Sequence, residues 1–455
     1  MSEPLTAQGT AYSRRAFLLM AALGAATACS PVTPKQQTEE QGNDGKPVEL
    51  SFWKPPGQEP KAENAYFDDL SASFASSHNN DKVKHLLLPW NDALTKYTAA
   101  FGGGTAPDLS YLVLLWLNQF SSAGALAALN DVDANLDLTG FQKNAIDSAK
   151  GKDGKLYGMP YYSSRWVLAL NEKIWEKAGK PALPKTYEDL GEFAKKLTFD
   201  RSGNTVGDTG FDKANIATYG LAWPGLYEIE TNYLWNYLWA YGADYVSEDG
   251  KDVGFDNAGG REALTLMRKI QESGAATPMT LYSDPLKWGE VLLTGRAGVQ
   301  WIAPPTAETF KKHPDARLKV LDLPSGPSGK FVVGGVGYLC ISAKTKYPET
   351  ALDFIKFATS DDNVSKYLQQ TLLFPVRDTI SADVYAPLTD SKSKKFLTDS
   401  LPQGEFMRLT RPLPYNAEQY LAGEINNYVS GQKDLDKMIK DASKQIHTMA
   451  KNAGM

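Results

Sequence analysis

The sequence contains very little cysteine and histidine. Its 455 residues include 2 Cys and 4 His. The four histidines are His78, His85, His313 and His447. None of them has the spacing of metal ligands, so the sequence predicts no metal site. Cys340 lies in the apolar segment 337–341, which is typical of a buried strand. We therefore predict that Cys340 is a small core residue and not a nucleophile.

The sequence also lacks the short motifs of common catalytic sites. It has no G-x-S-x-G and no H-E-x-x-H, and the glycines at 102–104 are not followed by the Lys-Ser/Thr of a P-loop,. Pairs of carboxylates are unavoidable in a chain with 53 acidic residues, so they do not predict a glycosidase,. We expect a protein that is not an enzyme and needs no cofactor. An exported carbohydrate-active enzyme is a minor alternative.

Strong net charge and long apolar runs are absent as well. The net charge is -5, and this mild acidic balance argues against nucleic acid as a partner,. After the first thirty residues the longest apolar run is 111–117, whereas a membrane-spanning helix needs about 20 apolar residues,. We therefore expect no membrane-spanning segment in the rest of the chain.

Aromatic residues, in contrast, are plentiful. The chain has 10 Trp and 22 Tyr, and every Trp lies between Trp53 and Trp301. Flat apolar rings either fill a large core or stack on a ligand. Composition alone leaves both possibilities open.

The first 47 residues have the features of an export signal and a tether. Arg14 and Arg15 precede a short apolar run, which is similar to a twin-arginine signal,. Cys29 follows small residues, as at a lipoprotein processing site, although Ala26 stands where leucine is usual. We predict a signal peptide over 1–28, then a lipidated cysteine and flexible tether over 29–47. The alternative is a plain cleaved signal.

Strands and helices alternate after the tether. Period-two segments predict strands, and apolar residues at helical spacing predict helices. The predicted strands are 48–53, 82–88, 107–112 and 297–302. The predicted helices are 63–77, 92–101, a helix starting at Thr186, 259–273, 347–358, 363–370 and 435–450. This order implies a parallel α/β sheet that binds ligands at the carboxyl ends of its strands, near Trp53, Ser110 and Trp116.

Six short motifs follow one another along this chain. They are G-T-A-P-D-L at 104–109, L-Y-G-M-P-Y at 156–161, L-N-E-K-I-W at 170–175, P-K-T-Y-E-D-L at 184–190, D-V-G-F-D-N-A-G at 252–259 and G-R-A-G-V-Q-W at 295–301. In order and spacing they resemble the extracellular solute-binding proteins of ABC sugar importers, the group related to maltose-binding protein.

This resemblance implies a two-lobed periplasmic-binding-protein type II fold with discontinuous lobes and a hinge. The implied N-terminal lobe is 48–161 with 335–385, and the implied C-terminal lobe is 162–334 with 386–455. The chain would cross between them near Tyr161, Gly334 and Tyr385. A ligand in the cleft would contact both lobes and favour their closure.

A sugar site needs aromatic platforms and hydrogen-bonding side chains. The residues expected at the ligand are Trp53, Trp116, Tyr161, Tyr162, Trp223, Trp235, Trp301 and Arg377. Weaker candidates are Lys54, Asn91, Glu228, Glu230 and Asn232. For each aromatic residue the alternative is a place in the core, and for Arg377 it is a surface salt bridge.

The sequence thus predicts an exported, lipid-anchored protein on the extracytoplasmic face of the cell membrane. It would capture a carbohydrate, most simply a di- or oligosaccharide, and deliver it as a monomer to the permease of an ABC importer. The main alternative is the same fold with a non-sugar solute. Polyamine or metal sites would need clustered acids or histidines, which the candidate loops lack,. A surface adhesion module is a further alternative.

Overall fold

The computed structural model describes residues 45–223, 234–281, 290–400, 405–407 and 417–452. Residues 45–455 form one compact unit. The predicted signal and lipidation residues Arg14, Arg15 and Cys29 lie outside the described part of the chain. Within that part, no helix has both the length and the apolar character needed to cross a membrane.

The first sheet has the strand order β12-β11-β3-β1-β2, and β4 and β5 also pair with β11. Its strands are β1 (Glu49–Lys54), β2 (Lys82–Leu87), β3 (Leu109–Val113), β4 (Leu126–Ala127), β5 (Met159–Arg165), β11 (Phe331–Ser342) and β12 (Glu405–Met407). The predicted parallel arrangement is confirmed for β1, β2 and β3. The sheet is nevertheless mixed, because β11 runs antiparallel to β3, β4 and β5.

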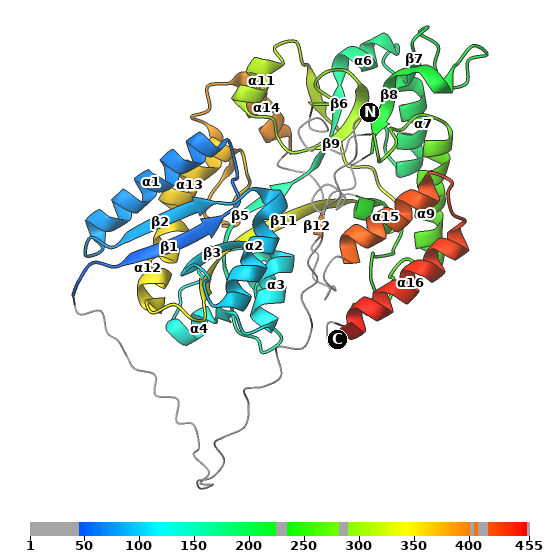
Figure 1. Cartoon of the computed structure of the whole chain (residues 1–455). Coiled ribbons are helices and arrows are strands. Elements are labelled where there is room, and N and C mark those ends of the chain that lie inside the picture. Colours follow the sequence, from blue (N-terminus) through cyan, green and yellow to red (C-terminus); the bar gives the residue numbers. More distant parts are fainter. Residues whose placement is uncertain (1–44, 224–233, 282–289, 401–404, 408–416, 453–455) are drawn as a thin grey trace, which may run out of the picture. The chain divides into compact units, whose positions relative to one another are not determined.

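Helices cover both faces of this sheet (Figure 1). They are α1 (Pro60–Ser77), α2 (Trp90–Gly103), α3 (Leu114–Ser122), α4 (Leu129–Val132), α5 (Lys143–Ser148), α12 (Pro348–Ala358), α13 (Asp361–Thr371) and the 3-10 turn η3 (Ala382–Tyr385). Alternation along β1 explains the two layers. Phe52 points to Phe67 of α1 and Phe354 of α12, whereas Trp53 points to Tyr97 of α2.

The second sheet has the strand order β10-β6-β9-β8-β7. Its strands are β6 (Val167–Asn171), β7 (Phe199–Asp200), β8 (Ile216–Ala222), β9 (Ala297–Ile302) and β10 (Leu318–Val320). Its helices are α6 (Glu172–Lys177), η1 (Lys213–Asn215), α7 (Tyr187–Leu197), α8 (Trp235–Ala240), α9 (Ala258–Glu272), α11 (Ala307–Lys312), α14 (Ser391–Ser400), α15 (Ala417–Val429) and α16 (Leu435–Asn452). The parallel pair β8–β9 lies at the centre of this sheet.

The predicted elements agree closely with the observed ones. The helix expected from Thr186 begins with a capping box in which Thr186 and Asp189 bond reciprocally to each other's backbone N–H groups,. The predicted stop at the glycines 102–104 is confirmed, because α2 extends to Gly103 and is capped by Gly104 with φ 73°,. Cys340 is fully buried in β11, and burial raises the pKa of its thiol. That burial makes the thiol a poor nucleophile.

Each sheet has its own large hydrophobic core. The first is built from residues between Val48 and Tyr162 and between Val336 and Leu397. The second is built from residues between Leu168 and Val332 and between Ala417 and Ile446. Phe396 of α14 packs on the opposite face of the second sheet. Leu115 of α3 packs against both of the large cores.

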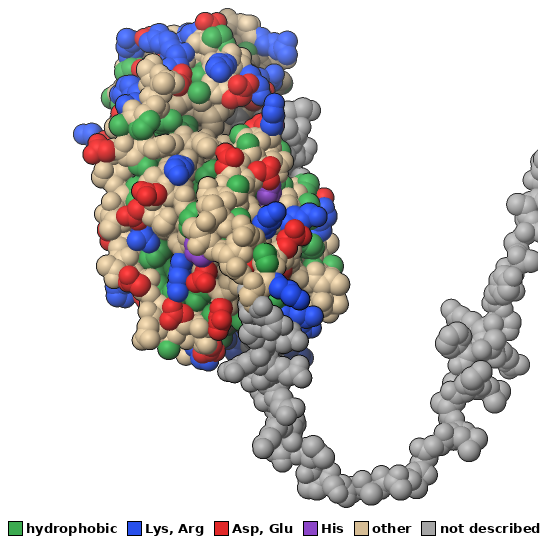
Figure 2. All heavy atoms as spheres, turned by 90° about the vertical axis from the view of Figure 1, so that its left-hand side faces the viewer, with side chains coloured by type: hydrophobic (Ala, Val, Ile, Leu, Met, Phe, Trp, Pro, Cys, Tyr) green, Lys and Arg blue, Asp and Glu red, His purple; other side chains and the backbone are tan. Residues whose placement is uncertain are grey.

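Charged side chains of both signs are interspersed on the face of the molecule shown in Figure 2. This face is the left-hand side of Figure 1. The mixture agrees with the small net charge of -5.

Candidate functional site

The carboxyl ends of β1, β2 and β3 carry three tryptophans. Trp53 is the penultimate residue of β1, Trp90 begins α2 after β2, and Trp116 lies in the first turn of α3 after β3. Trp53 and Trp90 are half-buried, and Trp116 is 4% exposed. Since parallel strands end at one edge of a sheet, the fold gathers these three residues in one region.

Ring contacts join the three tryptophans into one aromatic set. The Tyr97 ring lies 6.2 Å from that of Trp53 and 6.0 Å from that of Trp116. The Trp116 ring in turn lies 5.9 Å from that of Trp90. The indole N–H of Trp90 donates to the carbonyl of Pro56 at 2.9 Å, which fixes its ring beside the loop after β1. We call Trp53, Trp90 and Trp116 the first aromatic set.

Trp90 was missed by the sequence analysis. The signal was present, because Trp90 follows a predicted strand directly, as Trp116 follows β3. Its neighbour Asn91, a predicted ligand residue, lies in α2, but its side chain is outside the described part of the structure.

Tyr161 and Tyr162 of β5 lie inside the first core. They are 1% and 3% exposed. The Tyr162 ring stacks on Tyr111 at 5.3 Å and on Tyr367 at 5.4 Å, and the Tyr161 ring stacks on Tyr367 at 5.1 Å. Both rings are therefore held by their neighbours inside the first core.

Lys54 ends β1 and is completely buried. Its ammonium is ion-paired with Glu63 and donates to the carbonyl of Pro55 at 2.8 Å and to the Tyr367 hydroxyl at 3.2 Å. Burial lowers the pKa of Lys54, and the Glu63 carboxylate opposes that shift. The sequence suggested a ligand contact at Lys54. The structure instead occupies its three N–H groups within the fold, so we assign it a structural role.

The second sheet brings Trp223 and Trp301 together. Trp223 follows β8, and Trp301 lies in β9. Because Ala222 is paired with Gln300 in the parallel register, the two tryptophans are neighbours at the carboxyl ends of these strands. The Tyr237 ring of α8 lies 5.4 Å from the Trp223 ring. We call Trp223 and Trp301 the second aromatic set; each is 2% exposed.

Trp235 is integrated into the second core. It is 0% exposed, and its ring stacks on Tyr245 at 5.1 Å. Its indole N–H donates to Glu418 of α15 at 3.2 Å. These contacts favour a place in the core, which was the alternative to ligand contact for Trp235. We therefore leave Trp235 out of the aromatic sets.

The strands β5 and β11 meet at the predicted crossings. Arg165 at the end of β5 is paired with Gly334 of β11. Its guanidinium lies 5.1 Å from the centre of the Phe374 ring. Burial lowers the pKa of Arg165, and nearby Tyr385 has the opposite effect. The segments named as crossings at Gly334 and Tyr385 therefore lie beside one residue, Arg165, which the sequence analysis did not single out.

The Arg377 side chain contacts residues that lie around the first sheet. Its guanidinium is ion-paired with Asp361, lies 4.2 Å from the centre of the Phe141 ring and donates to the carbonyl of Thr139 at 3.3 Å. The side chain is 16% exposed. The salt bridge named as its alternative is thus present, and we do not place Arg377 at the ligand. Glu228, Glu230 and Asn232 lie outside the described residues.

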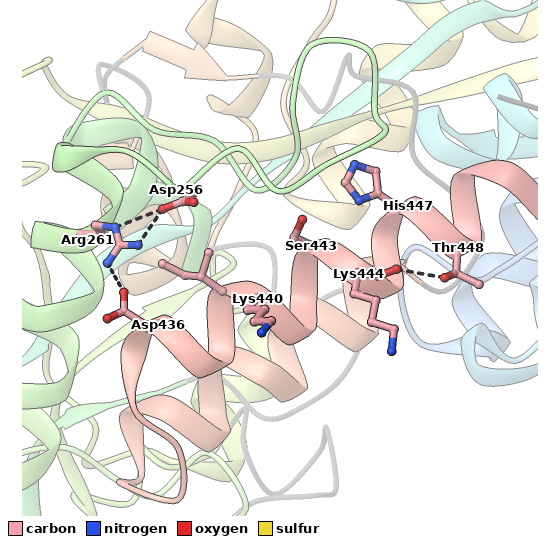
Figure 3. Close-up of a pocket in the computed structure, with 9 residues that line it drawn as sticks. Asp256, Arg261, Asp436, Lys440, Ser443, Lys444, His447 and Thr448 are labelled. Carbon is pink, nitrogen blue, oxygen red and sulfur yellow. Dashed lines mark hydrogen bonds and ion pairs between the residues drawn. The ribbon is translucent and has the colours of Figure 1, made fainter.

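A surface hollow of 630 Å³ lies elsewhere, between α9 and α16 (Figure 3). At one end Arg261 bonds to both Asp256 and Asp436, and Lys440 and Lys444 project from α16. It contains no residue of either aromatic set. We therefore build the candidate site on the carboxyl ends of the two sheets and not on this hollow.

The chain is similar to known proteins over most of its length. The family model described as bacterial extracellular solute-binding protein matches residues 69–395. The galactooligosaccharide-binding protein of Bacillus subtilis is 23% identical over 450 residues, covering 96% of this chain and 98% of the relative.

Two solved structures have a similar fold. The ABC substrate-binding protein Lmo0181 from Listeria monocytogenes, in complex with cycloalternan, has a TM-score of 0.71 and 21% identity, covering 90% of this chain and 100% of that one. UgpB from Mycobacterium tuberculosis, in complex with glycerophosphocholine, has a TM-score of 0.70 and 20% identity, covering 90% and 99%. The predicted type II binding-protein fold is confirmed by such neighbours.

Proposed function

Because the chain belongs to the family of bacterial extracellular solute-binding proteins, we propose that it captures a carbohydrate between its two sheets and delivers it to an ABC importer. The observation that carries this proposal is the position of the two aromatic sets. Trp53, Trp90 and Trp116 follow the strands of the first sheet, and Trp223 and Trp301 those of the second. A ligand held at both carboxyl edges would bias a hinge at β5 and β11 towards closure.

Aromatic side chains suit a sugar better than most other solutes. The apolar face of a pyranose ring packs on an indole, and its hydroxyls bond to polar groups at the rim. The two aromatic sets would offer more than one platform, so the proposed ligand is a di- or oligosaccharide and not a monosaccharide. The relative and the structural neighbour that are named for galactooligosaccharide and cycloalternan binding support this size class.

A second candidate ligand is a glycerophosphodiester. It is favoured by the likeness to UgpB, which was solved with glycerophosphocholine. UgpB is 20% identical to this chain, and Lmo0181, which was solved with cycloalternan, is 21% identical. A phosphodiester carries a negative charge and would need a cation at the site. Lys54 and Arg377 are ion-paired within the fold, which makes this candidate weaker than a sugar.

The export route and the anchor complete the proposal. The family is extracellular, which agrees with an export signal at the N-terminus. Arg14 and Arg15 direct export by the twin-arginine route, and Cys29 carries the lipid that holds the protein at the extracytoplasmic face of the membrane. The protein acts as a monomer, and it binds its sugar without turnover. Incubation with the bound glycan and chromatography of the products would reveal any hydrolysis and contradict that last point.

A thermal-shift screen of the full chain against mono-, di- and oligosaccharides and glycerophosphocholine tests the proposal. A ligand that binds only the folded state stabilises it by mass action, by about 2.7 kcal/mol at a ligand concentration of a hundred times the Kd. The Tm therefore rises. We expect a rise with one class of di- or oligosaccharide. A rise with glycerophosphocholine alone would select the second candidate, and a folded protein that responds to neither would contradict both.

A further inference from the structure

The side-chain amide of Asn236 in α8 is buried without a partner. Its exposed fraction is 0%, and neither Nδ2 nor Oδ1 has a hydrogen-bond partner among the described residues. Buried amides are normally paired, because removing them from water without a new bond costs free energy. A fold that keeps such a group in place therefore calls for a functional explanation.

Two other polar groups of the same helix are paired. The indole N–H of Trp235 donates to Glu418 at 3.2 Å, and that of Trp239 donates to Asp244 at 2.9 Å. The Trp235 indole leaves α8 about 100° from Asn236, whereas Trp239, three residues further along, lies on the same face of the helix as Asn236. Two indoles of α8 are thus hydrogen-bonded within the second core, whereas the Asn236 amide is not.

The direction of Asn236 follows from its helical neighbour Ala240. Residues four apart lie on the same face of a helix. The Ala240 carbonyl accepts from the backbone N–H of Ser328 at 2.9 Å, and a Cβ on Gly326 would come within 2.9 Å of the Ala240 side chain. α8 also packs against β11. Asn236 therefore lies on the side of α8 that faces the turn before β11, the strand that runs to the crossing at Gly334.

A second unpartnered polar group accompanies the amide. The Tyr237 hydroxyl is buried and has no hydrogen-bond partner among the described residues. Its ring lies 5.4 Å from the ring of Trp223, a member of the second aromatic set, and 4.4 Å from that of Tyr187. α8 thus combines unbonded polar groups with the aromatic platform at the end of β8.

The geometry points to Asn236 as a ligand-binding residue that bonds to the hydroxyls of the bound sugar. This inference rests on the proposed function and names a polar partner in the second half of the site. An amide has a donor and an acceptor side by side, which matches two adjacent sugar hydroxyls. A site with buried polar groups of this kind rejects ligands that lack the matching hydroxyls.

The test compares Asn236→Leu with Asn171→Leu in the full chain. Asn171 is a matched control, because it is also buried but its amide is paired. It donates to the carbonyl of Leu292 at 2.8 Å and accepts from the backbone of α6. The measurements are the Tm of the ligand-free protein and the Kd for the glycan found in the thermal-shift screen. Asn236→Ala repeats the test without adding apolar volume.

We expect the two variants to behave in opposite ways. Asn236→Leu removes an unpaired amide, so its ligand-free Tm stays equal to or above that of the wild type, while its Kd rises about tenfold or more. Asn171→Leu lowers the Tm and leaves the Kd unchanged. If both Asn236 variants bind the glycan with the wild-type Kd, the inference about Asn236 is overturned while the proposed function stands. A wild-type protein that binds no glycan would overturn the proposed function and, with it, the sugar contact of Asn236.

Discussion

At the residue scale, the buried network around Lys54 is the main device behind the first aromatic set. Lys54 joins the loop after β1 through Pro55, the first turns of α1 through Glu63, and α13 through Tyr367. The rings of Phe67, Tyr111 and Tyr367 surround its ammonium at 5.2 to 5.5 Å. A buried ammonium is tolerated only beside its counter-ion, which here is the Glu63 carboxylate,. The network therefore holds the loop after β1, α1 and α13 together beside Trp53.

Removal of the lysine alone tests this network. Lys54→Met leaves the Glu63 carboxylate buried without its cation, and we expect a loss of about 3–5 kcal/mol in the free energy of unfolding. The double variant Lys54→Met/Glu63→Met removes both charges and recovers most of that loss. Urea unfolding measures both values. A double variant no more stable than Lys54→Met would show that the ion pair is not the cause.

The sequence could place the aromatic residues but not their polar partners. Trp53 ends the predicted strand 48–53 and Trp116 follows the predicted strand 107–112, so the rule of strand ends brings them together before any coordinates are known,. Lys54 is different, because its partners Glu63 and Tyr367 are 9 and 313 residues away. The same holds for Arg377 and Phe141, and for Asn236, whose environment depends on β11. Tertiary packing, which local pattern does not encode, decides these contacts.

At the element scale, glycines allow the helices of the second sheet to approach its strands. A Cβ on Gly220 of β8 would lie 1.7 Å from the carbonyl oxygen of Ala194 in α7. Only a residue without a side chain permits this contact between strand and helix backbones. The close approach sets the depth of Trp223, three residues further along the same segment.

Gly220→Ala therefore tests the packing of α7 on β8. Backbone atoms must move to admit the methyl group, and we expect a loss of about 3 kcal/mol in the free energy of unfolding. Gly423→Ala in α15 is the matched control, since its Cβ meets nothing within 4 Å. That variant should gain about 0.5–1 kcal/mol from helix propensity. Equal midpoints of urea unfolding for the two variants would contradict the close packing.

The elements themselves could be predicted because their signals are local. Period-two segments predicted the first strands, and the sequence from Thr186 onward predicted the start of α7,. Strand direction could not be predicted in the same way. β11 joins the first sheet antiparallel to β3 and β5, after the residues between β5 and β11 have formed the second sheet, so no short-range pattern records its orientation,.

At the scale of the whole molecule, the chain passes between the two sheets where β5 leads into β6 and where β10 leads into β11. β11 pairs with β12 near one end and with β3 and β4 near the other, and β5 pairs with it between them. Arg165, Gly334 and Tyr385 gather where these segments meet. Flexing at a few such crossings would change the separation of the aromatic sets while both cores stay intact.

The central claim is that this molecule binds one oligosaccharide between its two aromatic sets. Calorimetric titration of the full chain with a glycan series of increasing length tests it most directly. The account predicts saturable binding of one glycan per chain, with a Kd that falls from the monosaccharide to the di- or oligosaccharide as a second platform is engaged. Binding of monosaccharides alone, or no heat with any glycan from folded protein, would contradict it.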